Sequence, residues 1–252
     1  MLNRTTAFLY GVACYLVTLV TFLFLAGFLG NVGLAKTIDS EPQVPFTRAL
    51  VINCALLGLF ALQHSIMARP WFKAVWTRVI SPVVERSTYL LFSCAAVSLL
   101  IWNWQPMGGV IWNVETPQLS VTLYALQVTG WIVVLAATFL LNHFDLFGLR
   151  QVWLHLRGKE YTHLVFRTPG MYRFVRHPLY LGWLLVFWSV PTMTAAHLVF
   201  ASGMAAYIFV AIQFEERDLA RQHPQYAEHR QRVPMILPTG SATPSGTSDA
   251  EA

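Results

Sequence analysis

The stretch RHPLYLG, residues 176–182, places an arginine, a histidine and a tyrosine where a hydrophobic region begins. That region continues to Gln213, and as one helix it would extend roughly 50 Å, well beyond a hydrocarbon core of about 30 Å. Residues 191–197, PTMTAAH, interrupt it with polar side chains and with a proline that disfavours helix in the preceding residue. We therefore predict a membrane hairpin over 179–213, with two arms of about 12 to 16 residues each.

This hairpin would bring together two polar clusters that are far apart in the sequence. The clusters are Arg176, His177 and Tyr180 at its entrance and Glu215, Glu216 and Arg217 at its exit. A carboxylate near the membrane is costly without a partner, so an interfacial salt bridge would explain the acids and the arginines. The histidine and the tyrosines, including Tyr172, add hydrogen-bonding groups that an ion pair does not require. We therefore predict a ligand site at this junction, on the cytoplasmic side.

The composition places the whole chain in a membrane. Of its 252 residues, 56% are hydrophobic and 12% charged, and its mean hydropathy is +0.51, which is too apolar for an ordinary soluble domain. Four further stretches are long enough to cross a bilayer: 6–30, 46–68, 88–104 and 121–141. We predict an all-α integral membrane protein with four transmembrane helices plus a C-terminal membrane helical hairpin.

A polar connection follows the fourth crossing. Within it, Leu146, Leu149, Trp153 and Leu156 recur at helical spacing, which indicates a cytoplasmic interfacial helix. No internal repeat or second domain is visible, so residues 1–238 are predicted to form one domain. The polar, aperiodic segment 239–252 is predicted to be a disordered tail.

The positions of the basic residues predict the orientation. The net charge is +5, and all lysines and arginines except Lys36 and Arg48 fall at the N-terminus, in 69–87, in 142–178 or after Gln213. The positive-inside bias places those segments in the cytoplasm, together with both termini, in a bacterial inner membrane. Nucleic acid is therefore not needed as a partner to explain the charge; the predicted partner is the lipid bilayer, and the oligomeric state stays open.

The motifs carry a family resemblance. TPGMYRFVRHPLYLG, followed after the hairpin by EERDL, resembles the C-terminal half of the isoprenylcysteine carboxyl methyltransferase superfamily of membrane enzymes. With QHSIMARPWFK at 63–73 and NHFDLFGLRQVW at 142–153, nearly the whole chain is similar to the bacterial methanethiol S-methyltransferases. That resemblance implies S-methylation of methanethiol, a small thiol, to dimethyl sulfide, with S-adenosylmethionine as the methyl donor and S-adenosylhomocysteine as its product.

The resemblance also implies the cofactor contacts. They fall on Arg176, His177, Tyr180, Leu181, Gly182, Glu215 and Glu216, and we expect Gly170 and Tyr172 to complete the wall. An arginine suits the carboxylate of S-adenosylmethionine, and a glutamate suits its ammonium and ribose hydroxyls. Prenylcysteine enzymes carry a Phe-Gly pair and two spaced tyrosines after the glutamates, whereas this chain has Gln222-His223-Pro224 and the single Tyr226. The difference argues against a prenylated substrate.

A thiol needs a base or a positive field before it becomes a good nucleophile. Two helix ends offer candidates: His143 with Asp145 closes the fourth crossing, and His64 beside Gln63 closes the second. We expect His143, oriented by Asp145, to take the thiol proton and His64 to shape the acceptor pocket, although either histidine could lead. The remaining predicted substrate-binding residues are Gln63, Arg150 and Gln151. No histidine spacing indicates a metal site.

Two other readings stay open. A membrane methyltransferase could keep the cofactor site and act on another acceptor, such as a lipid amine, a carboxylate or another thiol. A non-catalytic membrane protein, like those associated with nitrite and nitric oxide metabolism, would share parts of this architecture but would not bind S-adenosylmethionine saturably.

Overall fold

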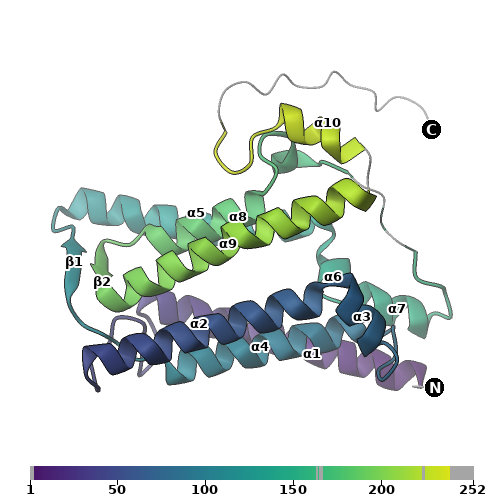
Figure 1. The fold of residues 1–252 in the computed structure, drawn as a ribbon, viewed down its shortest axis with the longest axis horizontal. Coiled ribbons are helices and arrows are strands. Elements are labelled where there is room, and N and C mark those ends of the chain that lie inside the picture. Colours follow the sequence, from purple (N-terminus) through teal and green to yellow (C-terminus); the bar gives the residue numbers. More distant parts are fainter. Residues whose placement is uncertain (1–2, 163, 165–166, 223–224, 239–252) are drawn as a thin grey trace.

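The helices of this protein run lengthwise beside one another, as the ribbon in Figure 1 shows. The computed structural model describes residues 3–162, 164, 167–222 and 225–238; the tail predicted over 239–252 lies outside them. The α-helices are α1 (Arg4–Gly30), α2 (Phe46–Ala68), α3 (Pro70–Trp76), α4 (Glu85–Asn103), α5 (Pro117–Leu141), α6 (His143–Leu146), α7 (Leu149–Leu156), α8 (Pro178–Trp188), α9 (Ala195–Gln222) and α10 (Gln225–Arg232). A 3-10 turn (Gly170–Arg173) and two strands, β1 (Val110–Asn113) and β2 (Thr192–Thr194), complete the described elements.

Four of the described helices, α1, α2, α5 and α9, are long and apolar enough to cross a membrane. Their outer faces carry exposed large apolar side chains, among them Leu23 of α1 and Val121 of α5, which is the arrangement that lipid favours over water. The predicted fold class, an all-α integral membrane protein, is confirmed. The third predicted crossing, 88–104, corresponds to α4, a helix of 19 residues that begins at Glu85 and packs between α1 and α2.

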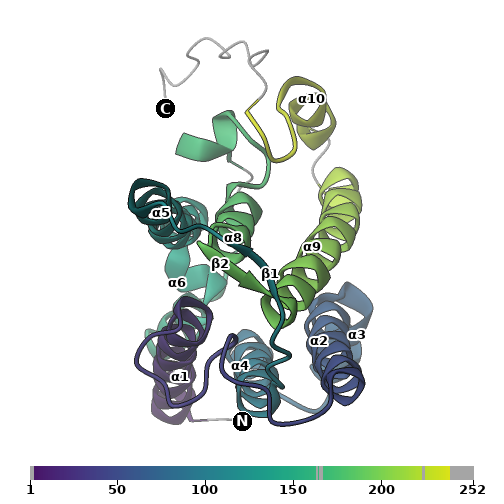
Figure 2. The ribbon, with the colours of Figure 1, turned by 90° about the vertical axis from the view of Figure 1, so that its left-hand side faces the viewer.

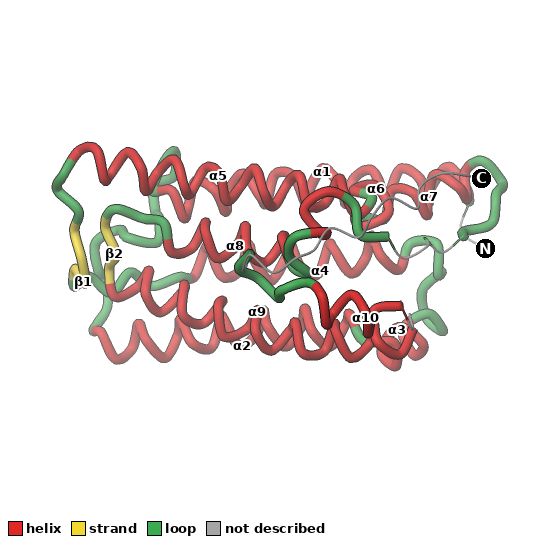
Figure 3. Tube along the Cα trace, turned by 90° about the horizontal axis from the view of Figure 1, so that it is seen from above, coloured by secondary structure: helices red, strands yellow, loops and turns green. Residues whose placement is uncertain are grey.

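The long helices form two layers. An end-on view shows α1, α4 and α2 in one layer and α5, α8 and α9 in the other (Figure 2). The short helices α3, α6 and α7 lie at one end of the bundle and the two strands at the opposite end (Figure 3). The basic segments gather at the end with the short helices, whereas Lys36 and Arg48 belong to the strand end. Positive charges that are far apart in the sequence therefore lie at the same end of the molecule.

The predicted hairpin exists, but its arms are unequal. α8 has 11 residues and spans about 16 Å, whereas α9 has 28 residues and spans about 42 Å. We predicted that the second arm ends at Gln213; in the structure the helix continues to Gln222, because residues 215–222 are almost all strong helix formers and include no glycine or proline. Glu215 and Glu216 thus lie inside α9 and not beyond its end.

The turn of the hairpin is fastened at the strand end. β2 pairs antiparallel with β1, a small sheet that the sequence patterns did not reveal. His197, fully buried, places Nδ1 3.2 Å from Asp39 Oδ2 and Nε2 3.0 Å from the carbonyl oxygen of Phe187. Burial alone would raise the pKa of Asp39, but hydrogen bonding and the charge of His197 outweigh burial and hold that pKa below its usual range. The turn is thereby tied to the α1–α2 loop.

Two glycines bring α5 and α8 into backbone contact. A Cβ at Gly182 would lie 2.9 Å from the carbonyl oxygen of Gly130, and a Cβ at Gly130 would lie 2.8 Å from the carbonyl oxygen of Gly182. Only glycine fits such an approach, because any side chain would meet backbone atoms that cannot move aside. Gly182, predicted to contact the cofactor, therefore faces a neighbouring helix.

This contact predicts a matched pair of variants. Gly182→Ala should destabilise the protein by roughly 1–3 kcal/mol, because its methyl group would overlap the α5 backbone. Gly58→Ala, in α2, should be neutral or stabilising by up to about 1 kcal/mol, since a Cβ there meets no described atom within 4 Å. Thermal unfolding in detergent micelles measures both. Equal stability of the two variants would contradict the packing described.

Candidate active site

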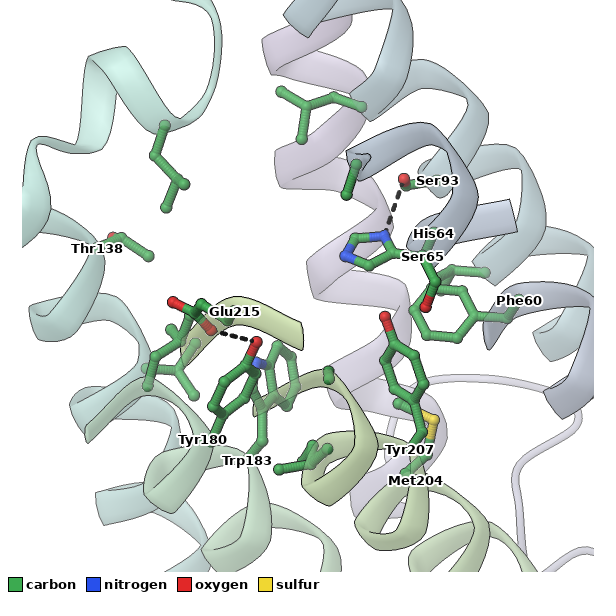
Figure 4. A pocket seen from close by; sticks show the side chains of 18 of the residues that line it. Phe60, His64, Ser65, Ser93, Thr138, Tyr180, Trp183, Met204, Tyr207 and Glu215 are labelled. Atoms are coloured by element: carbon green, nitrogen blue, oxygen red, sulfur yellow. Dashed lines mark hydrogen bonds between the residues drawn. The ribbon is translucent and has the colours of Figure 1, made fainter. Parts of the chain in front are cut away.

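A cavity of about 520 Å³ lies between the two helix layers and is lined by both. Its volume is within the range of small-molecule sites, and most of its wall is apolar. Its polar and titratable lining residues are Thr18, Thr21, His64, Ser65, Arg69, Arg86, Tyr89, Ser93, Thr138, Tyr172, His177, Tyr180, Tyr207, Glu215 and Asp218. Figure 4 shows several of these side chains from close by, with His64 and the Tyr180–Glu215 pair on different walls. The site combines a dry interior with a small number of polar groups.

Glu215 and Glu216 have separate surroundings because consecutive residues of a helix point about 100° apart. Glu216 is almost completely buried, with 3% of its side chain exposed, and does not line the cavity. Its Oε1 lies 2.8 Å from Arg176 Nε and 3.1 Å from His177 Nε2, and its Oε2 lies 3.1 Å from Arg230 Nε. Glu216 is thus fully paired.

Arg176 also holds the segment that follows α10. Its Nη1 donates to the carbonyl oxygens of Arg230 at 2.8 Å and Val233 at 2.7 Å, and its backbone N–H donates to Pro234 at 2.9 Å. With Nε bound to Glu216, this guanidinium is occupied by the protein itself and does not line the cavity. The entrance and the exit of the hairpin do lie together, as predicted. Arg176 and Glu216 hold this junction together and do not face the cavity.

Of the two consecutive glutamates, Glu215 is the one that lines the cavity. Its Oε2 accepts a hydrogen bond from the Tyr180 hydroxyl at 3.0 Å, and 44% of its side chain is exposed. Within the described chain, no hydrogen bond involves Oε1, so one carboxylate oxygen is open to a ligand. Burial and the nearby Glu215 charge raise the pKa of Tyr172 above its usual range, so that phenol stays a hydrogen-bond donor.

His64 lines the opposite part of the cavity. It stacks on Phe60 with ring centroids 5.3 Å apart, and Nδ1 lies 3.1 Å from Ser93 Oγ. Ser93 donates its own proton to the carbonyl oxygen of Tyr89 at 3.0 Å, so it accepts from Nδ1 and leaves the lone pair on Nε2. The Tyr89 hydroxyl lies 2.9 Å from Nε2. Both ring nitrogens of His64 therefore have hydroxyl partners, which hold the ring in position at the cavity wall.

His143 has a different environment. It is buried and does not line the cavity; Nε2 lies 2.8 Å from the Tyr15 hydroxyl and Nδ1 2.8 Å from Thr138 Oγ1. Its ring stacks on Phe139 with centroids 4.2 Å apart, and burial lowers the pKa of His143. Both ring nitrogens have protein partners, and no hydrogen bond joins His143 to Asp145 in the described chain. The structure does not form the predicted His143–Asp145 pair.

The other predicted substrate residues lie outside the cavity wall. Asp145 Oδ1 pairs with Arg150 Nη1 at 3.0 Å, and Gln151 Nε2 lies 3.3 Å from the Asp145 carbonyl oxygen. Gln63 Nε2 lies 3.2 Å from Met67 Sδ. The contacts of Asp145 join α6 to α7, and the contact of Gln63 lies within α2.

Of the predicted cofactor residues, four line the cavity: Tyr172, His177, Tyr180 and Glu215. The others, Gly170, Arg176, Leu181, Gly182 and Glu216, support the wall from behind. A Cβ at Gly170, for example, would lie 3.0 Å from Leu140, a side chain of α5. The predicted cofactor residues therefore include both residues that line the cavity and residues that pack behind its wall.

Several lining residues were not predicted. Arg86, Tyr89 and Ser93 lie on one face of α4 at spacings of three and four residues, a polar stripe in an otherwise apolar helix that is a usable sequence signal. Arg69 and Asp218 pair at 3.0 Å across α2 and α9, which no sequence spacing reveals. These two arginines supply the positive charge at the cavity wall.

Comparisons with known proteins agree with this architecture. No family model matches the chain, and no solved structure matches it significantly. The methanethiol S-methyltransferase of Crocosphaera subtropica is 54% identical over 238 residues, which cover 94% of this chain and 93% of that protein. The enzyme of the same name from Mycobacterium tuberculosis is 50% identical, with 94% and 98% covered. Nurim of Bos taurus is 30% identical over 74% of this chain and 72% of its own length. Near-complete coverage at this identity confirms the resemblance found in the motifs, and the chain belongs to the methanethiol S-methyltransferase family.

Proposed function

We propose that this protein methylates methanethiol to dimethyl sulfide, using S-adenosylmethionine, in the cavity between its helix layers. The observation that carries the proposal is the identity of 54% and 50% to full-length relatives that bear the name of this reaction. The cavity supports the proposal, because its largely apolar wall carries a carboxylate with an open oxygen, two arginines and a histidine. Individual residues of the cavity have distinct proposed roles in this reaction.

The donor fits the polar part of the cavity. S-adenosylmethionine supplies a methyl group on a positively charged sulfur and also carries an ammonium, a carboxylate and ribose hydroxyls. Glu215 has an open oxygen for the ammonium or a hydroxyl, with Tyr180 fixing its orientation. Arg86, whose side chain forms no ion pair or hydrogen bond within the described residues, is suited to the carboxylate, whereas Arg69 already pairs with Asp218 at 3.0 Å. Arg86 replaces Arg176 in this role, since Glu216 and backbone carbonyls occupy Arg176.

His64 is the proposed proton acceptor. A thiol must lose its proton to attack a methyl carbon, and Nε2 of His64 can take that proton at the cavity wall when the Tyr89 hydroxyl, 2.9 Å from Nε2, turns to the carbonyl oxygen of His64, 3.4 Å away. Tyr89 and Ser93 orient the ring, and stacking on Phe60 limits its rotation. His143 is proposed as a positioning residue, because it reaches the cavity through Thr138 and Phe147, which line it, and not directly.

The apolar wall favours this reaction. A thiolate and a sulfonium lose their charges as the methyl group moves, so a dry site disfavours the reactants more than the dispersed charge of the transition state. Fixed donors such as Tyr89 and Tyr180 replace part of the lost hydration. A small apolar thiol also partitions readily into such a cavity.

We also infer the orientation of the protein. The end that holds the short helices and most basic residues faces the cytoplasm, with both termini on that side, in the cytoplasmic membrane of a bacterium. The polar part of the cavity, which includes Arg69, Arg86 and Asp218, lies toward this end. S-adenosylmethionine, a charged metabolite of the cytoplasm, would then reach the site without crossing the bilayer.

The histidine assignment is testable. His64→Gln should lower turnover of methanethiol by about 10²–10⁴-fold while binding of S-adenosylmethionine stays intact. Its residual activity should rise with pH, because solvent ionises the thiol when the base is missing. Dimethyl sulfide in the headspace, measured by gas chromatography across a pH series, provides the readout. Isothermal titration with S-adenosylhomocysteine provides the binding control.

His143→Gln is the comparison for that variant. The substitution removes a hydrogen bond to Tyr15 or Thr138, so it should lower the free energy of unfolding by about 1–3 kcal/mol. It should reduce turnover less than His64→Gln does. If His143→Gln instead lost more turnover than His64→Gln while its stability stayed unchanged, His143 would be the base. Full activity of both variants would reject a histidine base.

The two glutamates should separate binding from stability. Glu215→Gln should weaken S-adenosylmethionine binding about tenfold or more with little loss of stability, because a charge-assisted contact is lost in the cavity. Glu216→Gln should destabilise the protein by roughly 3–5 kcal/mol, since the buried Arg176 then keeps a charge without its partner and the half-exposed Arg230 loses its ion pair. Calorimetric titration and thermal unfolding measure the two quantities. A stable Glu216→Gln protein with selectively lost binding would reverse these roles.

A volatile-product assay tests the acceptor. Methanethiol should be methylated in preference to larger thiols, lipid amines and carboxylates at equal concentration. The absence of saturable S-adenosylmethionine binding to the purified protein would instead favour the non-catalytic reading.

A further inference from the structure

A second cavity lies at the basic end of the bundle, apart from the proposed methylation site. Its volume is about 540 Å³, and residues from the start of α1, from α3, from the start of α4 and from around α7 line it. The lining residues with charge are Arg4, Lys73, Arg86 and Lys159, with Glu85 and Glu160. The basic side chains therefore outnumber the acidic ones.

The four basic side chains are unpaired among the residues that the structure describes. Within the described chain, none of the four forms a side-chain hydrogen bond or ion pair, although acids are present in the same wall. Lys73 and Arg86 are half-buried, and burial, followed by repulsion from Arg86, lowers the pKa of Lys73. Like charges that are held together and partly desolvated are costly unless an anion lies between them. The cluster therefore has the character of a binding site for negative charge.

A second, independent feature of this cavity also points to a ligand. Gln151, which lines it, is 9% exposed, and its Oε1 is buried without a hydrogen-bond partner among the described residues. Its Nε2 is directed to Asp145 at 3.3 Å and 3.4 Å, so the amide orientation is fixed. A buried acceptor without a donor costs stability, and a hydroxyl or ammonium group of a ligand would satisfy it.

The position of the cavity matches the level of lipid headgroups. Arg4 begins α1, one of the helices that can span the membrane, and a Cβ at Gly158 would lie 3.0 Å from Arg4 Nη1. The Arg4 guanidinium therefore lies against the backbone after α7, although the residue as a whole is exposed. Basic pockets between transmembrane helices at the cytoplasmic surface are suited to phosphate-bearing headgroups.

We propose that the cavity lined by Arg4, Lys73, Arg86, Lys159 and Gln151 binds a phosphate group that carries a hydroxyl or ammonium donor. The phosphate contacts the basic side chains, and the donor contacts Gln151 Oε1. Arg86 also lines the methylation cavity, so a bound anion offsets positive charge close to that site. The ligand is either an anionic lipid headgroup or a free phosphate compound, and both share this chemistry.

The test uses the purified full chain in a neutral detergent. Short-chain phosphatidylglycerol, short-chain phosphatidylcholine and inorganic phosphate are titrated separately, with binding measured by calorimetry. The wild-type protein should bind phosphatidylglycerol or phosphate about tenfold or more tightly than phosphatidylcholine. Competition distinguishes the sources: displacement of phosphatidylglycerol by phosphate identifies a free anion site, and binding of the lipid without such displacement identifies a headgroup site.

The variants locate the site. Lys73→Gln should weaken binding about tenfold, whereas Lys73→Arg should retain it, because the charge is kept. Arg78→Gln is the matched control, since Arg78 is an exposed cation near the same end but does not line the cavity; its binding should equal that of wild type. If Lys73→Gln does not fold, the exposed Lys159→Gln provides the same measurement.

Several outcomes would overturn the proposal. They are equal binding of phosphatidylglycerol and phosphatidylcholine without binding of phosphate, the same loss in Lys73→Gln and Arg78→Gln, or undiminished binding when Lys73 or Lys159 is replaced by Gln. Each would show that general surface charge, and not this cavity, attracts the anion. Because the readout is binding and not methyl transfer, failure here leaves the proposed reaction untouched.

Discussion

The buried carboxylate of Glu216 is the interaction on which the site depends. A negative charge near the end of a membrane-crossing helix is costly unless donors surround it. Glu216 obtains them from Arg176 and His177 at the start of the hairpin and from Arg230 in α10. One charge thus joins segments that are 39 to 54 positions apart in the sequence. The C-terminal segment is held over the hairpin by the same arginine.

The neighbouring Glu215 can face a ligand because Glu216 performs this structural role. Helix geometry turns adjacent side chains about 100° apart, so one carboxylate points into protein and the next into the cavity. Tyr180, one turn inside α8, then holds Glu215. On the other layer, Ser93 and Tyr89 orient His64 in a comparable manner. The polar groups of the cavity are each fixed by a second residue, as preorganised sites require.

The sequence predicted the class of fold and the junction of the hairpin ends well. A proline with polar neighbours at 191–197 marks a turn in any apolar segment, and the return of Glu215 to His177 and Tyr180 follows from it. The length of α9 was underestimated, because charged residues after Gln213 resemble a helix exit when hydropathy alone is read. The high helix propensity of residues 215–222 contained the missing information.

The detailed roles at the site could not be read from the sequence. His64 and His143 both lie near a helix end and both have hydroxyl partners. Only the tertiary structure separates them, because His64 lines the cavity and His143 does not. Likewise Arg176 looks available until the carbonyl oxygens of Arg230 and Val233 are placed on it. The strands β1 and β2 are too short for a pattern to indicate, since their pairing is set by the ends of the helices that they connect.

The glycine contact between α5 and α8 has a consequence for the divergence of this family. Gly130 and Gly182 leave no room for these helices to approach further, and any larger residue would force them apart. The wall of the cavity that α5 and α8 form therefore tolerates few substitutions at the glycine contact. New acceptor sizes should then arise by exchange of bulky side chains on the facing layer, at positions such as Phe60 and Leu100, while the spacing of this helix pair is inherited unchanged.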